Sequence, residues 1–253
     1  MHKLKLAFLG LGLSSAIALP ATGDTLLTGN FNGQNYSLLL NGVYTVPADS
    51  GGPSATFNNS SAVGMNVLTL GTGGTLNIEG GQFDSNGNYG LNFIQDTAGA
   101  TSAVNISGGD FSNNGYGIVA NDPSVQLTIS GGNFSGNKTG GGILFESGTA
   151  TVTGGTFSNN GDDFVSESQT PVEIYGSFNG LNPGDTEIIN GFNGVSEIFT
   201  GQLENSSAPQ TFRSVIAVAG AEFVLNDVAV PEPATVSLLA AFAGLAMVRR
   251  RRR

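Results

Sequence analysis

The chain has 253 residues with 39 glycines, no cysteine, no tryptophan and one histidine, and only 11% of its residues are charged. This composition is atypical of a helical protein, whose surface favours Ala, Leu, Glu and Lys, and it indicates an all-β fold. The lack of cysteine excludes disulfides, thiolate metal sites and cysteine nucleophiles. His2, the only imidazole, lies in a segment that we expect to be removed.

The charges are distributed unevenly along the chain. The formal net charge is −10 at pH 7, from nine basic and 19 acidic residues. Nearly all the acidic residues lie in the body of the chain, between the two terminal segments. The only basic residues in this body are Lys138 and Arg213. Binding to nucleic acid depends on Lys and Arg that neutralise phosphates, so the sequence excludes nucleic acid as a partner. Divalent cations and a hydrated polysaccharide matrix remain compatible with this charge.

Residues 1–21 have the layout of a secretory signal peptide. Lys3 and Lys5 precede an apolar run at residues 6–13, and small residues with Pro20 follow it. The run is too short for a typical transmembrane anchor. We therefore expect a signal helix here and its cleavage after Ala18 or after Ala21, two sites between which the layout does not decide.

The next segment predicts two strands, at residues 36–40 and 43–46. Asn41-Gly42 between them is a type I′ hairpin signal, and a hairpin would suit an N-terminal cap. Phe57-Asn58-Asn59, followed by residues 64–67, resembles the later half of the repeat described next. The repetitive part of the fold is therefore expected to begin before its first clear copy.

The centre of the chain contains copies of one pattern, apolar-x-apolar-x-Gly-Gly-x-Phe. The copies begin at Leu76, Val104, Leu127 and Ala150, and a fifth at Val172 reaches its Phe one residue early. Their first glycines recur every 22 to 28 residues, and the extra residues of the first step predict a loop around residues 95–102. Such a step is typical of a solenoid whose turns stack as parallel rungs about 4.8 Å apart. The sequence therefore predicts a right-handed parallel β-helix, with clear repeats over residues 75–178.

The same positions of each copy predict columns of like side chains along the stack. Three kinds of column are expected: aliphatic (Leu76/Ile78, Val104/Ile106, Leu127/Ile129), phenylalanine (Phe83, Phe111, Phe134, Phe157) and asparagine (Asn86, Asn114, Asn137, Asn160). Asparagine tolerates left-handed backbone, and its amide can bond to the next rung, which makes this column a structural device at a turn. The alternative is an edge of amides that binds sugars or ions. A second strand should follow each turn, at residues 90–94, 117–120, 142–145 and 164–165.

Beyond the repeats, residues 211–218 and 222–228 predict two strands joined at Ala219-Gly220. They would cap the last rung, because open solenoid edges invite aggregation. Residues 193–205 receive no assignment from the pattern.

The body shows no catalytic constellation. Polysaccharide lyases with this fold rely on basic residues, and a glycosidase needs two carboxyl groups at a set separation. Asp162-Asp163 is the only adjacent acidic pair; it occupies the turn phase of the repeat, and neighbours in a strand point to opposite faces. We therefore expect no enzyme activity, with a polysaccharide-active β-helix lyase or glycosidase as the alternative.

Metal binding is an open alternative to a solvated acidic surface. Hard oxygen ligands for Ca²⁺ occur at turns, in Asp84, Asp96, Asp110, Asp122, Asp162 and Asp163. The glycine-rich calcium nonapeptide and the EF-hand loop are both absent from the sequence, which favours the solvated surface. No cofactor is predicted.

The C-terminal segment, residues 230–253, has three parts in a fixed order. Val230, Pro231, Glu232 and Pro233 come first, residues 234–248 carry no charge, and Arg249, Arg250, Arg251, Arg252 and Arg253 end the chain. The prolines prevent an earlier helix start. A short transmembrane helix is expected over residues 234–248, with the arginines on the cytoplasmic side.

This tail, on a chain with a signal peptide, resembles the PEP-CTERM sorting domain. The resemblance implies recognition by exosortase, a membrane-embedded transpeptidase-like enzyme, and processing near Pro231, Glu232 and Pro233. It also implies delivery to the surface alongside exopolysaccharide. An ordinary single-pass tail anchor is the alternative, and both interpretations include a membrane stage.

Three segments follow from these patterns: a signal peptide (1–21), a solenoid with its caps (22–229) and a sorting signal (230–253). We expect export across the inner membrane, transient anchoring, and a final place at the cell surface or in the extracellular matrix. The expected role is structural or adhesive, in association with exopolysaccharide.

Overall fold

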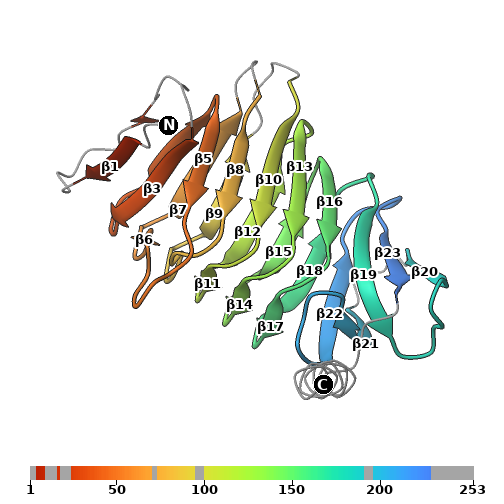
Figure 1. Ribbon diagram of the computed structural model, residues 1–253. Coiled ribbons are helices and arrows are strands. Elements are labelled where there is room, and N and C mark those ends of the chain that lie inside the picture. Colours follow the sequence, from red (N-terminus) through yellow and green to blue (C-terminus); the bar gives the residue numbers. More distant parts are fainter. Residues whose placement is uncertain are drawn as a thin grey trace, which may run out of the picture.

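The computed structural model describes residues 4–8, 16–17, 24–69, 73–94, 100–190 and 196–228, the first two ranges by their backbone alone. Every regular element in this part of the chain is a strand, in agreement with the all-β expectation. Figure 1 shows the strands side by side, from the N-terminal end in red to the C-terminal end in blue. The tail at residues 230–253 lies outside the described residues.

Most strands belong to two long stacks with parallel pairing between successive members. The first stack contains β1 (Leu4–Phe8), β3 (Asp24–Asn30), β5 (Val43–Val46), β8 (Thr75–Ile78), β10 (Ser102–Ile106), β13 (Val125–Ile129), β16 (Thr149–Val152), β19 (Val172–Phe178) and β23 (Phe223–Asp227). The second contains β2 (Ala16–Ile17), β4 (Tyr36–Leu40), β7 (Val63–Thr69), β9 (Tyr89–Ile94), β12 (Tyr116–Asn121), β15 (Gly141–Phe145), β18 (Asp162–Ser166) and β22 (Gln210–Ile216). The second strands predicted for each repeat are thus confirmed.

A third, short stack lies between the two long ones along the chain. It contains β6 (Ala55–Thr56), β11 (Asp110–Ser112), β14 (Asn133–Ser135) and β17 (Thr156–Ser158), with Gln82 bridging β6 and β11. Each turn of chain, which we call a rung, therefore runs from the first stack through the short stack to the second. This arrangement is compatible with the predicted solenoid.

The Gly-Gly pair forms the corner between the first stack and the short stack. At Gly131 a Cβ atom would lie 2.2 Å from the carbonyl oxygen of Ser107 in the preceding rung, so only glycine allows the rungs to approach. Gly132 has φ of 100°, a left-handed conformation that glycine adopts without steric cost. Glycine is therefore required at Gly131 by the close approach of the rungs and favoured at Gly132 by the left-handed backbone.

The interior is a hydrocarbon core built from the predicted columns. In the aliphatic column Val104 pairs with Leu76 on one side and Leu127 on the other, and all three are buried. Phe83, Phe111, Phe134 and Phe157 stack with ring centroids 4.7–5.1 Å apart and nearly parallel planes. The column extends toward the N-terminus through Phe57 and Phe31. Both column predictions are confirmed.

The hairpin predicted at Asn41-Gly42 is wrong. The strands on either side have the expected bounds, β4 and β5, but they pair with rungs above and below and not with each other. Asn41-Gly42 is instead a corner that carries the chain from the second stack to the first. This segment is a full rung and not a cap.

The C-terminal cap also differs from the expectation. The predicted strands are β22 and β23, which continue the two long stacks in parallel and do not form a hairpin. Two antiparallel strands cover them: β20 (Thr186–Ile189) pairs with β23, and β21 (Glu197–Leu203) pairs with both β22 and β19. The unassigned residues 193–205 therefore contain the whole of the capping strand β21.

The N-terminal end of the stack has no antiparallel capping strand among the described residues and ends in a further parallel rung. Of residues 1–21, the structure describes only β1 and β2, which pair in parallel with β3 and β4 and so add one rung to the stack. The rest of the expected signal segment lies outside the described residues, and so do residues 95–99 of the loop predicted at residues 95–102.

Candidate functional site

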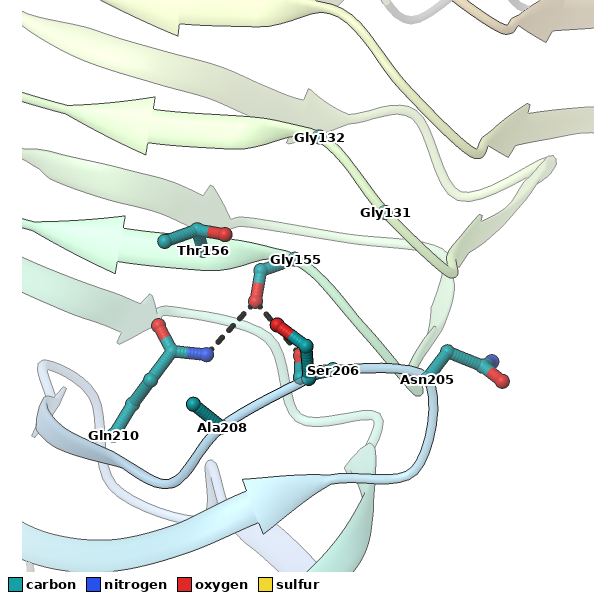
Figure 2. A pocket seen from close by; sticks show the side chains of 9 residues that line it. Gly131, Gly132, Gly155, Thr156, Asn205, Ser206, Ala208 and Gln210 are labelled. Carbon is teal, nitrogen blue, oxygen red and sulfur yellow. Dashed lines mark hydrogen bonds between the residues drawn. The ribbon is translucent and has the colours of Figure 1, made fainter. Parts of the chain in front are cut away.

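Two cavities are candidate sites. The first lies where the loop between β21 and β22 crosses the Gly-Gly corners of two successive rungs. Gln210 Nε2 and Ser206 Oγ both donate to the carbonyl oxygen of Gly155, at 2.9 Å and 3.0 Å, and Figure 2 shows these bonds. Gln210 Oε1 also accepts from the backbone N–H of Phe157 at 2.8 Å. The cavity measures about 260 Å³ and is lined by Gly131, Gly132, Gly155, Thr156, Asn205, Ser206, Ser207, Ala208 and Gln210. These residues offer hydrogen bonds and no ionisable group.

A second hollow, of about 380 Å³, lies beneath the capping strands. Glu187 of β20 and Glu197 of β21 contribute its two carboxyl groups. Both residues are exposed.

The pair Asp162-Asp163 lies in a strand and not in a turn, which corrects the predicted phase. Asp162 Oδ1 is 3.7 Å from Arg213 Nε and accepts from Ser196 Oγ at 2.7 Å. The Asp163 carboxylate is buried and accepts from Asn160 Nδ2 and from the backbone N–H of Arg213, at 2.9 Å and 3.0 Å. Burial raises the pKa of Asp163, against the lowering effect of these bonds. Each carboxyl group thus has its own environment and partners.

The asparagine column is structural in its geometry. Asn86 Nδ2 donates to Asn114 Oδ1 at 3.1 Å, and Asn137 Nδ2 donates to Asn160 Oδ1 at 3.0 Å. Each of the four amides also donates to a backbone carbonyl, and three of the four side chains are buried. Left-handed backbone occurs one residue earlier than expected, at Ser85, Asn113 and Asn159. These amides therefore face the protein and do not form a binding edge.

The candidate calcium ligands do not converge. Among the described residues, which exclude Asp96, no group of three or more His, Cys, Asp or Glu side chains could hold a metal ion. Asp122 is fully buried, and its carboxylate accepts from Thr69 Oγ1, from Ser124 Oγ at 2.7 Å and from the Ser124 N–H at 2.9 Å. Asp110 accepts from Asn133 Nδ2 at 2.9 Å, and Asp84 from Asn113 Nδ2 at 2.8 Å.

A surface that sequence reasoning missed lies on the outer side of the second stack. One register row of this stack contains Val119, Leu144 and Val165. Their neighbours in each strand point into the core, so these three side chains point outward, yet they are only 2–7% exposed. Tyr89 and Tyr116 pack against this row, with ring centroids 6.3 Å apart. We call these five residues the tyrosine face. Aligning the repeats would have revealed its row, because the three positions are apolar in successive copies.

Carboxyl groups act electrostatically on Tyr116 of the tyrosine face. Burial raises the pKa of Tyr116, and the charges of Glu167, Asp162 and Glu146 add to this effect. Burial also raises the pKa of Glu146, with a further contribution from Glu167. Aromatic rings beside hydrogen-bonding oxygens form an amphipathic surface, with apolar faces and polar edges.

The sorting residues predicted from the sequence, Val230, Pro231, Glu232, Pro233 and Arg249–Arg253, lie outside the described residues. In the part of the chain that the structure describes, no helix is both long and apolar enough to cross a membrane. The span expected at residues 234–248 is not in that part.

In comparisons with known proteins, no family model, no curated protein and no solved structure matches this chain.

Proposed function

We propose that this protein is an exported, non-enzymatic scaffold of the cell surface or extracellular matrix. Its body is a right-handed parallel β-helix that associates with exopolysaccharide, and its tail is a sorting signal for an exosortase-type enzyme. Before processing, the helix at residues 234–248 holds the chain in the inner membrane, with Arg249–Arg253 on the cytoplasmic side.

The observation that carries a structural role is the use of polar side chains within the stack. The asparagine column and Asp163 form hydrogen bonds with groups of the same or adjacent rungs. Asp122 bonds to Ser124 of its own rung and to Thr69, two rungs away. Buried polar groups with complete sets of partners hold a fold in one arrangement. This favours a rigid rod whose contacts with other molecules lie on its outer surface.

The right-handed sense follows a general rule for parallel strands. A connection between two parallel strands of one sheet is right-handed in about 98% of cases, because strand twist favours that sense. Every rung here makes such a connection between successive strands of the first stack. The proposed β-helix is therefore right-handed.

The tyrosine face supports contact with a polysaccharide. The C–H face of a sugar ring is apolar and packs against the electron-rich face of an aromatic ring, while its hydroxyl groups bond to nearby oxygens. Tyr89 and Tyr116 provide the rings, and Glu146 and Glu167 lie near Tyr116. The acidic surroundings favour a neutral sugar chain over an anionic one.

The sorting step is tested by the intact mass and the cell fractionation of the native protein, in cells with and without their sorting transpeptidase. We expect a mature chain that ends near Pro231–Pro233 and reaches the surface only when the enzyme is present. A chain that keeps Arg249–Arg253 in the membrane in both strains would contradict sorting and leave a plain tail anchor.

The glycan contact is tested by co-sedimentation of the mature protein with neutral and anionic exopolysaccharide, together with an assay for released reducing ends. We expect binding to the neutral polymer without cleavage. Tyr116→Ala should weaken binding several-fold, and Tyr175→Ala, which changes a tyrosine of the first stack, should not. Release of oligosaccharides would instead support the lyase or glycosidase alternative.

A further inference from the structure

The N-terminal end of the stack is completed by the segment that the proposed function removes. β1 and β2 pair in parallel with β3 and β4, in registers that join Leu4 to Thr25 and Ala16 to Ser37. Cleavage after Ala18 or Ala21 would remove both strands. The mature chain would then begin with a rung whose β3, of seven residues, and β4, of five, have no partner on one side.

This rung lacks the lysine and proline residues that protect many open sheet edges in natural proteins. Such edges carry lysine, proline, bulges or inward charges, which discourage pairing with another chain. From residue 24 to residue 46 the chain has no lysine and no proline, and Asp24 is its only charged residue. Thr45 Oγ1 donates to Asp24 at 3.0 Å. Leu27, Leu38 and Leu40 of this rung belong to the buried core.

Charge also distinguishes the two ends of the molecule. The C-terminal part carries seven carboxyl groups, Glu173, Asp185, Glu187, Glu197, Glu204, Glu222 and Asp227. Like charges oppose self-association of an acidic chain, and this repulsion is smallest where the charges are fewest. The N-terminal rung is therefore the end at which two copies meet with the least repulsion.

The C-terminal end cannot accept the N-terminal rung of another copy in the same parallel manner. The antiparallel strands β20 and β21 cover β23, β22 and β19 there, so the rung geometry is interrupted. Head-to-tail stacking, which would produce a filament, is thereby blocked. The arrangement that remains is an isologous one, in which the same edge of two copies pairs about a two-fold axis.

We propose that removal of the signal peptide opens the edge formed by β3 and β4, and that two mature chains pair through it in a closed, head-to-head dimer. This inference rests on the export step of the proposed function. In the dimer, β3 pairs antiparallel with β3 of the second copy. The retained signal segment occupies the same edge, so it prevents pairing before export.

Native mass spectrometry, which removes detergent, tests the proposal on the protein purified from the producing cells. We expect a dimer for the mature chain and a monomer for the variant Ala18→Leu/Ala21→Leu, in which both cleavage sites are blocked. Thr28→Lys, on the outer face of β3, should shift the mature chain to monomer, because two like charges meet across the pair. Thr128→Lys, on the outer face of the central β13, is the matched control and should stay dimeric.

The orientation is tested with single spin labels, since the chain has no cysteine of its own. A label on Thr28→Cys should give one short distance between copies, and a label on Glu204→Cys, at the far end, should give none. A short distance at Glu204, masses above the dimer, or a mature chain that is monomeric would overturn the dimer alone. A native chain that still carries residues 1–21 would overturn both the dimer and the export step.

Discussion

The side chain of Asn114 forms three hydrogen bonds at the turn of a rung. Its Oδ1 accepts from the backbone N–H and from Nδ2 of Asn86, at 2.9 Å and 3.1 Å. Its Nδ2 donates to the carbonyl oxygen of Phe83 at 2.8 Å. The side chain is 4% exposed, so water cannot replace these partners. The column of asparagines thus connects rungs that the strand pairing alone would leave unconnected at this corner.

Asn114→Ala should therefore lower the free energy of unfolding by about 2–3 kcal/mol, because it leaves buried donors and acceptors without partners. Urea unfolding followed by circular dichroism measures the loss. Asn105→Ala is the matched control: Asn105 also bonds to an asparagine of the adjacent rung, Asn77, but at the exposed surface. It should cost about 0.5 kcal/mol or less. Equal losses in the two variants would contradict the structural role of the buried column.

Asp163 gives a prediction of pH dependence. Burial raises its pKa, so the folded protein keeps this proton to higher pH than the unfolded chain does. Its contribution to stability is therefore complete at low pH and is lost as the pH rises through the pKa of the folded state. Relative to Asp163→Asn, the wild-type protein should lose free energy of unfolding as the pH is raised from about 4, near the ordinary carboxyl pKa, toward neutrality. Chemical unfolding of both proteins across this range measures the difference, and a gain with rising pH would refute the assignment.

At the scale of the element, the start of each strand in the second stack is set by a close approach between rungs. A Cβ atom at Gly117 would lie 2.6 Å from the carbonyl oxygen of Gly142, and one at Gly90 would lie 2.7 Å from that of Gly117. Glycine at these positions is a requirement of the stacking distance, because any side chain would separate the rungs.

Gly117→Ala should consequently destabilise the protein by about 1–3 kcal/mol, the usual cost of overpacking. Gly52→Ala is the control, because a Cβ atom there meets nothing within 4 Å and the backbone is not left-handed. It should leave the melting temperature unchanged or slightly higher. Thermal unfolding of both variants is the measurement, and a harmless Gly117→Ala would show that the rungs can separate at this corner.

At the scale of the whole molecule, the stack is nearly one-dimensional, since the strands of each rung pair only with those of neighbouring rungs. Packing between aromatic rings holds the C-terminal cap against the stack. Phe199 of β21 lies against Phe178, Phe164 and Phe212, with centroids 5.1–6.3 Å apart. This cluster joins the cap to both long stacks.

Phe199→Ala should loosen the C-terminal end and leave the rest of the stack unchanged. Amide hydrogen exchange should accelerate in β18, β19, β22 and β23, and stay as in the wild type in β7 to β10. Ile198→Ala changes the adjacent residue of the same strand, which is 66% exposed, and should have little effect. A uniform acceleration along the chain would mean that the stack unfolds as one cooperative unit, contrary to this prediction.

The rungs of the clear repeats, their register and their core could be predicted from the sequence alone, because each repeat contains its own determinants. The alternating aliphatic residues, the Gly-Gly corner, the Phe and the Asn recur at a regular step, and stacking like on like is the only register that aligns all of them. The lack of cysteine excludes disulfides and thiolate sites, because these depend on composition and not on placement. The scarcity of basic residues likewise predicts, from composition alone, that nucleic acid is not a partner.

Only the tertiary structure decided which strands pair at the two ends of the stack and which side chains gather on its outer surface. Asn41-Gly42 is compatible with a hairpin locally, but β4 and β5 gain more by pairing with adjacent rungs on both sides. The cap at β20 and β21 depends on which edge is left free, and no local pattern contains that information. The tyrosine face likewise exists only once Val119, Leu144 and Val165 lie in one row. Local sequence determines local geometry, whereas the choice of partner for an edge is made by the whole fold.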